Sequence, residues 1–147
     1  MARQRLGVVL LVPQPLATQV DGLRRALGDG ALGRIDPHIT LVSPVNVAER
    51  DLPHAFSAVR LAAAAVAPPV DELGALVLGV APLSLRLGPV ATFAQPNPVA
   101  YLRVGGEPQV LEALERLRVG CLQGPLARSL EREYVPHVTV ADDLGEL

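Results

Sequence analysis

The chain has 147 residues, enough for one domain with a buried core, and half of them are hydrophobic. Its formal net charge of −2 excludes a global attraction to nucleic acid or to a membrane surface, so any contact with RNA must be local. One cysteine excludes an intrachain disulfide and a cysteine-based metal cluster, which favours a cytoplasmic location. All thirteen basic residues are arginines, which is typical of a GC-rich bacterial coding sequence.

The first third of the chain predicts two strand–helix units. An apolar run at residues 6–12 predicts a strand, and apolar residues at helical spacing over 15–27 predict an amphipathic helix. Gly28 is available for a left-handed cap at the end of that helix. A strand is then expected over 35–47, followed by an alanine-rich helix over 51–66 with Asp51 as its N-cap.

The remainder predicts further strands and one more helix. Residues 70–80 fit a strand, a short helix or an apolar loop, and periodicity does not decide between them. The other expected elements are strands at 83–87 (continuing at 90–93 after Gly88-Pro89) and 99–104, a helix at 107–117 and a strand at 134–141. The order predicts two related halves within a single domain, residues 1–147.

One pattern occurs twice, as Pro37-His38-Ile39-Thr40-Leu41 and as Pro136-His137-Val138-Thr139-Val140. Successive side chains of a strand point to opposite faces, so each histidine shares a face with its threonine. Two such strands beside one cleft would supply two imidazoles and two hydroxyls. That combination suits acid–base chemistry at a phosphate.

A lone histidine on a strand is more often structural than catalytic, because it can satisfy a backbone carbonyl. Here two of three histidines and two of four threonines fall in one repeated pattern, which favours catalysis. His54 is expected to face solvent, and no ligand spacing supports a three-histidine zinc site. Cys121 is expected to fill the core.

The sequence leaves the roles of three further residues undecided. Tyr101 and Arg103 share one face of their strand, where they either meet substrate or lie on a solvated face. Tyr134 is a candidate for stacking on a base, but strand alternation places it opposite His137 unless Pro136 bends the strand.

The paired pentads, with residues 88–93 and 98–102, resemble the 2H phosphoesterase superfamily, and within it the bacterial 2′-5′ RNA ligase and cyclic phosphodiesterase-like proteins. Those proteins carry two His-x-Thr/Ser-x motifs roughly a hundred residues apart, as His38 and His137 are. The resemblance implies a bilobal α+β fold in which two antiparallel sheets surround a central groove with pseudo-two-fold symmetry and helices cover the outer faces. It also implies catalytic roles for the two histidines and phosphate-binding roles for Thr40 and Thr139.

The implied reaction is hydrolysis of 2′,3′-cyclic or 2′-5′ phosphodiesters without a metal or other cofactor, with 2′-5′ ligation as its reverse. The expected partner is a nucleotide or an RNA terminus that bears such an ester, with no DNA, no membrane and a monomeric protein. The alternative is a binding module that holds an RNA end or nucleotide in the same groove without turnover.

Two features depart from the family pattern. Many relatives have a basic residue just after the second motif, where this chain has Asp142-Asp143. Relatives also usually continue for a few dozen residues beyond that motif, so either a shorter lobe is completed in another way or a C-terminal strand or helix is lacking. Both features favour the binding module, whereas two complete motifs favour the enzyme.

Overall fold

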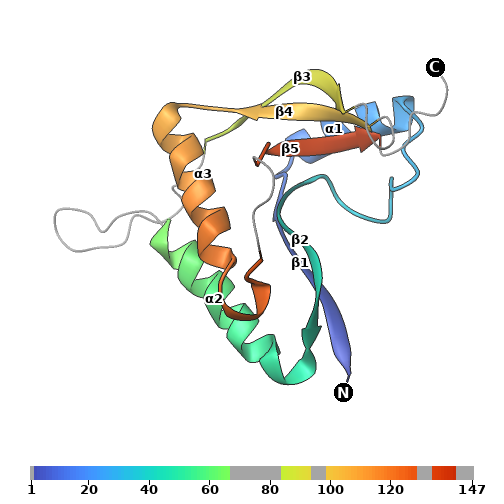
Figure 1. Cartoon of the computed structure of the whole chain (residues 1–147). Coiled ribbons are helices and arrows are strands. Elements are labelled where there is room, and N and C mark those ends of the chain that lie inside the picture. Colours follow the sequence, from blue (N-terminus) through green and yellow to red (C-terminus); the bar gives the residue numbers. More distant parts are fainter. Residues whose placement is uncertain (1, 67–83, 94–98, 129–133, 142–147) are drawn as a thin grey trace. The chain divides into compact units, whose positions relative to one another are not determined.

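The computed structural model describes residues 2–66, 84–93, 99–128 and 134–141 (Figure 1). Its strands are β1 (Arg3–Leu11), β2 (His38–Ala48), β3 (Arg86–Phe93), β4 (Val99–Gly105) and β5 (His137–Ala141). Its helices are α1 (Leu16–Ala26), α2 (Leu52–Ala65) and α3 (Pro108–Cys121), with short 3-10 turns η1 (Glu49–Asp51) and η2 (Gly124–Leu126). The predicted α+β class is confirmed.

The described strands form one five-stranded sheet in the order β1-β2-β5-β4-β3. The last of the described strands, β5, lies in the middle of the sheet and pairs antiparallel with both β2 and β4. β3 pairs antiparallel with β4. The expectation of two sheets related by a pseudo-two-fold axis is therefore not confirmed, because the two motif strands are neighbours in one sheet.

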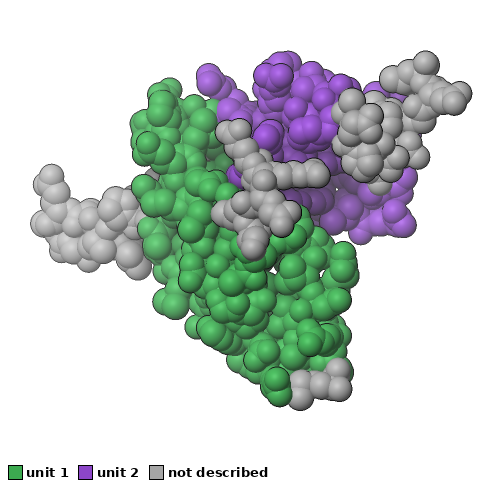
Figure 2. All heavy atoms as spheres, in the orientation of Figure 1, with its two compact units in different colours: residues 1–8, 41–85, 106–133 green, residues 9–40, 86–105, 134–147 purple. Residues whose placement is uncertain are grey.

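The chain divides into two compact units, each assembled from three segments (Figure 2). Unit 1 comprises residues 1–8, 41–85 and 106–133, and unit 2 comprises 9–40, 86–105 and 134–147. Both histidine–threonine pairs belong to unit 2, although they lie about a hundred residues apart in the sequence. The single domain spanning 1–147 stays a prediction.

Unit 1 is held together by α2 and α3, which pack on each other. A Cβ atom added at Gly120 of α3 would lie 2.9 Å from the Cβ of Ala62 in α2, so the small residue permits a close approach of the helices. Cys121 ends α3 fully buried, and burial raises the pKa of its thiol, so it stays protonated at neutral pH. Its predicted place in the core is confirmed.

Unit 2 is built on β5, which α1 contacts. The buried residues of α1 are Ala17, Val20 and Arg24, a helical spacing that gives α1 one inward face. On β5, Val138 and Val140 are completely buried. Since alternate residues of a strand face opposite ways, the other face of β5 presents its histidine and threonine, both half-buried.

Several element boundaries differ from the predictions. Both motif strands begin at their histidine, not upstream, because the preceding residue is a proline that cannot donate a ladder hydrogen bond. Gly88-Pro89 forms a bulge inside one continuous strand, β3. Asp51 precedes α2 as predicted but makes no side-chain cap bond, because η1 continues directly into the helix.

The remaining comparisons with the sequence concern Gly28, residues 70–80 and the length of the apolar helices. Gly28 follows α1 with φ of 70°, the expected left-handed conformation. The undecided segment 70–80 lies outside the described residues. Among the helices of the described part, none offers the continuous apolar length that a bilayer crossing requires.

Candidate functional site

The register between β2 and β5 aligns the two motifs. Ile39 lies opposite Val138 in an antiparallel pair, and both side chains are buried. Their sequence neighbours therefore point to the other face of the sheet. One step along the ladder in either direction brings a histidine of one motif opposite a threonine of the other.

We call these four residues the quartet: His38 opposite Thr139, and Thr40 opposite His137. Directly opposed side chains have Cβ atoms about 5 Å apart, and diagonal neighbours are separated by about 7 Å. The two imidazoles occupy one diagonal and the two hydroxyls the other. All four lie on one face of the sheet within unit 2.

Each imidazole is oriented by the same backbone contact. Nδ1 of His38 lies 2.8 Å from the carbonyl oxygen of Asp36, and Nδ1 of His137 lies 2.7 Å from that of Val135. A carbonyl oxygen only accepts hydrogen bonds, so each Nδ1 carries the hydrogen and donates it. Nε2 therefore faces any ligand in both rings, as a proton acceptor when the imidazole is neutral and as a donor when it is charged.

The proline of each pentad accounts for this contact. It lies between the histidine and the carbonyl that the ring contacts, with its own φ fixed near −65° and the preceding residue kept extended. The carbonyl oxygen of Pro37 also accepts a hydrogen bond of 3.0 Å from the backbone N–H of Val12, which ties the start of β2 to the end of β1. The residue before each histidine is thus part of the site's geometry.

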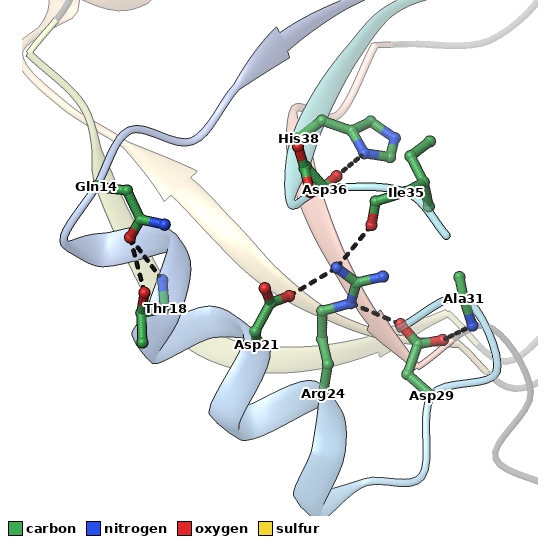
Figure 3. A network of polar contacts seen from close by, with 9 residues as sticks. All are labelled: Gln14, Thr18, Asp21, Arg24, Asp29, Ala31, Ile35, Asp36 and His38. Atoms are coloured by element: carbon green, nitrogen blue, oxygen red, sulfur yellow. Dashed lines mark hydrogen bonds and ion pairs between the residues drawn. The ribbon is translucent and has the colours of Figure 1, made fainter. Parts of the chain in front are cut away.

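A buried arginine supports the segment that leads to His38 (Figure 3). The side chain of Arg24 in α1 donates from Nε to Asp29 and from Nη1 to Asp21, each at 2.8 Å. Nη1 also donates to the backbone oxygen of Ile35 at 2.9 Å. Arg24 is only 2 % exposed, so this network fixes the loop between α1 and β2 from inside unit 2.

Aromatic rings surround the other histidine. The rings of Phe93 on β3 and Tyr101 on β4 are stacked, with centroids 4.1 Å apart. Both meet the His137 imidazole edge-on, at centroid distances of 5.2 and 5.4 Å. Tyr101 is buried, so this cluster restricts the His137 ring on the β4 side.

Tyr134 connects the two motif strands. Its hydroxyl donates a hydrogen bond of 2.6 Å to the backbone oxygen of Thr40. The tyrosine, three residues before His137, is thereby fixed against β2. This contact gives Tyr134 a structural role, and the suggestion that it stacks on a base is not needed to explain its position.

Comparison with known proteins places the chain in a family. Residues 12–146 match the model of the 2′-5′ RNA ligase superfamily. The chain belongs to this superfamily. It is also 29% identical over 144 residues to a protein of Bacillus cytotoxicus named "Putative phosphoesterase", covering 97% of this chain and 72% of that protein. Similarly named proteins of Bacillus mycoides and Bacillus cereus are 28% and 27% identical over the same length and shares.

Membership of the 2′-5′ RNA ligase superfamily confirms the resemblance to 2H phosphoesterases and supports a phosphoesterase-type function. The structure brings the four predicted site residues together, while their chemical roles stay predictions. His54 is exposed at the start of α2 in unit 1. No group of three or more histidine, cysteine or acidic side chains with metal-binding geometry occurs in the described ranges.

Sequence reasoning missed Phe93 and Arg24. The strands expected at 90–93 and 99–104 are close enough in sequence to form a hairpin, and their pairing brings Phe93 diagonally close to Tyr101. Arg24 lies on the apolar stripe of its helix, and an arginine at such a position indicates a buried, paired charge.

Proposed function

We propose that this protein is a metal-independent phosphodiesterase that acts on 2′,3′-cyclic or 2′-5′ phosphodiesters of nucleotides or RNA ends. One observation carries the proposal. The two imidazoles lie diagonally across paired strands, each with Nδ1 bonded to a backbone carbonyl and Nε2 left for a ligand. A phosphate between them would have a proton acceptor on one side and a proton donor on the other.

In the proposed hydrolysis, Nε2 of the neutral imidazole takes a proton from water while the water oxygen attacks phosphorus. The bond from phosphorus to one ribose oxygen breaks, and Nε2–H of the imidazolium protonates that oxygen. The hydroxyls of Thr40 and Thr139 donate hydrogen bonds to the non-bridging oxygens, where negative charge accumulates. The histidines then exchange protons with solvent and return to their starting states. In the ligation direction, a 5′-hydroxyl would take the place of water. It would lose its proton to the neutral imidazole and attack the phosphorus of a 2′,3′-cyclic phosphate. The bond from phosphorus to the 3′ oxygen would break, the imidazolium would protonate that oxygen, and a 2′-5′ diester would result.

The test is hydrolysis of the four nucleoside 2′,3′-cyclic monophosphates and of a 2′-5′-linked dinucleotide, with EDTA present. We expect wild-type turnover to survive EDTA, and His38→Ala and His137→Ala each to lower kcat/KM by about 10²-fold or more. His54→Ala is the matched control, because it removes the third histidine, in unit 1, and should leave the rate unchanged. The pH–rate profile should be bell-shaped, since one histidine must be neutral and the other charged.

Other outcomes would contradict the proposal. Turnover that EDTA abolishes would show a metal-dependent reaction. A folded wild type that binds these nucleotides saturably without converting any of them would be the binding module instead.

A further inference from the structure

The side of the quartet formed by β4 carries a charged residue in addition to the aromatic pair. The register between β4 and β5 places Arg103 directly opposite His137, and Tyr101 opposite Thr139. Opposed residues of paired strands share a face, so Arg103 lies on the face that bears the quartet. Its Cβ is expected about 5 Å from that of His137.

Arg103 differs from the buried arginines of the molecule. Arg24 and Arg118 each pair with acidic side chains of their own unit. Arg103 is exposed, and among the described residues it forms no ion pair or hydrogen bond. Its charge is therefore available to a ligand on this face.

The opposite side of the quartet has different chemistry. The hydrogen bond from Val12 to Pro37 aligns β1 with β2 so that Leu11 lies opposite His38 and Val9 opposite Thr40. These two side chains are 64 % and 40 % exposed and carry no charge. A ligand on this face thus meets an aliphatic edge on β1 and a guanidinium on β4.

We propose that Arg103 is a substrate-binding residue whose guanidinium contacts phosphate oxygens beside His137. The inference rests on the proposed function and extends it, because it gives the bound substrate a direction, with a phosphate toward β4. A guanidinium has a planar set of donors that matches two oxygens of one phosphate. The rings of Phe93 and Tyr101 contact the imidazole of His137, so a phosphate bound beside this histidine would lie near an aromatic pair as well as a guanidinium.

Binding is measured first, because it does not depend on turnover. Adenosine 2′-monophosphate and 3′-monophosphate are titrated into wild type, Arg103→Gln, Arg103→Lys and Arg25→Gln. Arg25 is the matched control, an exposed arginine on α1 in the same unit. We expect Arg103→Gln to raise Kd about tenfold and to reduce its salt dependence, Arg103→Lys to retain part of the affinity, and Arg25→Gln to match wild type. Adenosine, which lacks phosphate, should bind all four proteins equally.

Measurements of kcat/KM then identify which phosphate of the substrate Arg103 contacts. 2′,3′-cyclic AMP is compared with its 5′-phosphorylated form in wild type and Arg103→Gln. An equal loss of kcat/KM for both substrates would assign Arg103 to the reacting cyclic phosphate. A loss confined to the 5′-phosphorylated substrate would assign it to the 5′-phosphate. Either result supports a phosphate contact.

These measurements test the role of Arg103 and the proposed reaction separately. Wild-type turnover combined with unchanged kcat/KM and unchanged Kd in a folded Arg103→Gln would overturn the role of Arg103 and leave the proposed reaction standing. Phosphate-dependent binding that weakens in Arg103→Gln, without hydrolysis by wild type, would remove the reaction and leave the contact.

Discussion

The two histidines of the quartet have the same local geometry and different surroundings. Each follows a proline and donates from Nδ1 to the carbonyl two residues earlier. Behind His38 lies a polar network centred on buried Arg24, whereas His137 is enclosed by Phe93 and Tyr101. Each ring is therefore oriented by the backbone immediately before its pentad, while residues distant in the sequence differ between the two sides.

The largest difference between the two histidines is expected from Arg24→Met, which removes the centre of the polar network beside His38. It removes the buried ion pair between Arg24 and the carboxylate of Asp29, whose side chain is 2 % exposed. Breaking one side of a buried ion pair costs about 3–5 kcal/mol, so the free energy of unfolding should fall by about that amount in denaturant titrations. The Nδ1–H signal of His38 in NMR spectra should broaden more than that of His137.

The double variant Arg24→Met/Asp29→Asn serves as the control, because it removes the negative charge of the pair together with the positive one. It should recover part of the lost stability but not the ordered His38 signal. Equal changes at both histidines in the single variant would show that the network supports the whole unit and not the His38 side.

A smaller effect is expected from Phe93→Leu, which changes the aromatic surroundings of His137. It keeps an apolar side chain on β3 but removes the stacking on Tyr101 and the edge contact with His137. Such aromatic pairs contribute up to about 1.5 kcal/mol beyond their buried area. The His137 ring signals should shift while those of His38 stay in place. A shift at His38 of the same size would contradict the separation of the two sides.

The smallest effect is expected from Tyr134→Phe, which removes one hydroxyl and leaves the ring. The lost hydrogen bond to the Thr40 oxygen should lower the free energy of unfolding by about 1 kcal/mol. Because this bond joins the two motif strands, NMR shifts should appear at both histidines. Tyr134→Leu, which also removes the ring, should cost more, and no change in either variant would rule out the proposed link.

The four site residues were predictable because strand alternation is local. Period-two spacing alone places each histidine and its threonine on one face, and glycine at position 28 indicates the end of α1. The neighbour relation between the two motif strands was not predictable in this way. It depends on β5 inserting between β2 and β4, a pairing of segments about a hundred residues apart that no local pattern encodes.

The surroundings of the histidines were harder to predict for the same reason. Alternation placed Tyr101 and Arg103 on one face of their strand but left open whether that face meets solvent or substrate. The pairing of β4 with β5 decides that they share the face of His137. The contact of Arg24 with the Ile35 backbone depends on how a loop folds back on a helix, which sequence periodicity does not describe.

The central place of β5 also determines when the molecule can fold. In the described sheet, β2 and β4 are connected only through this strand, which is synthesised after both of them. Until it arrives, both present open hydrogen-bonding edges, so a growing chain exposes two sites for misassembly. Contacts of such long sequence separation slow the search for the native topology. The site can therefore assemble only after β5 has been synthesised, and any chaperone dependence should be greatest before that point.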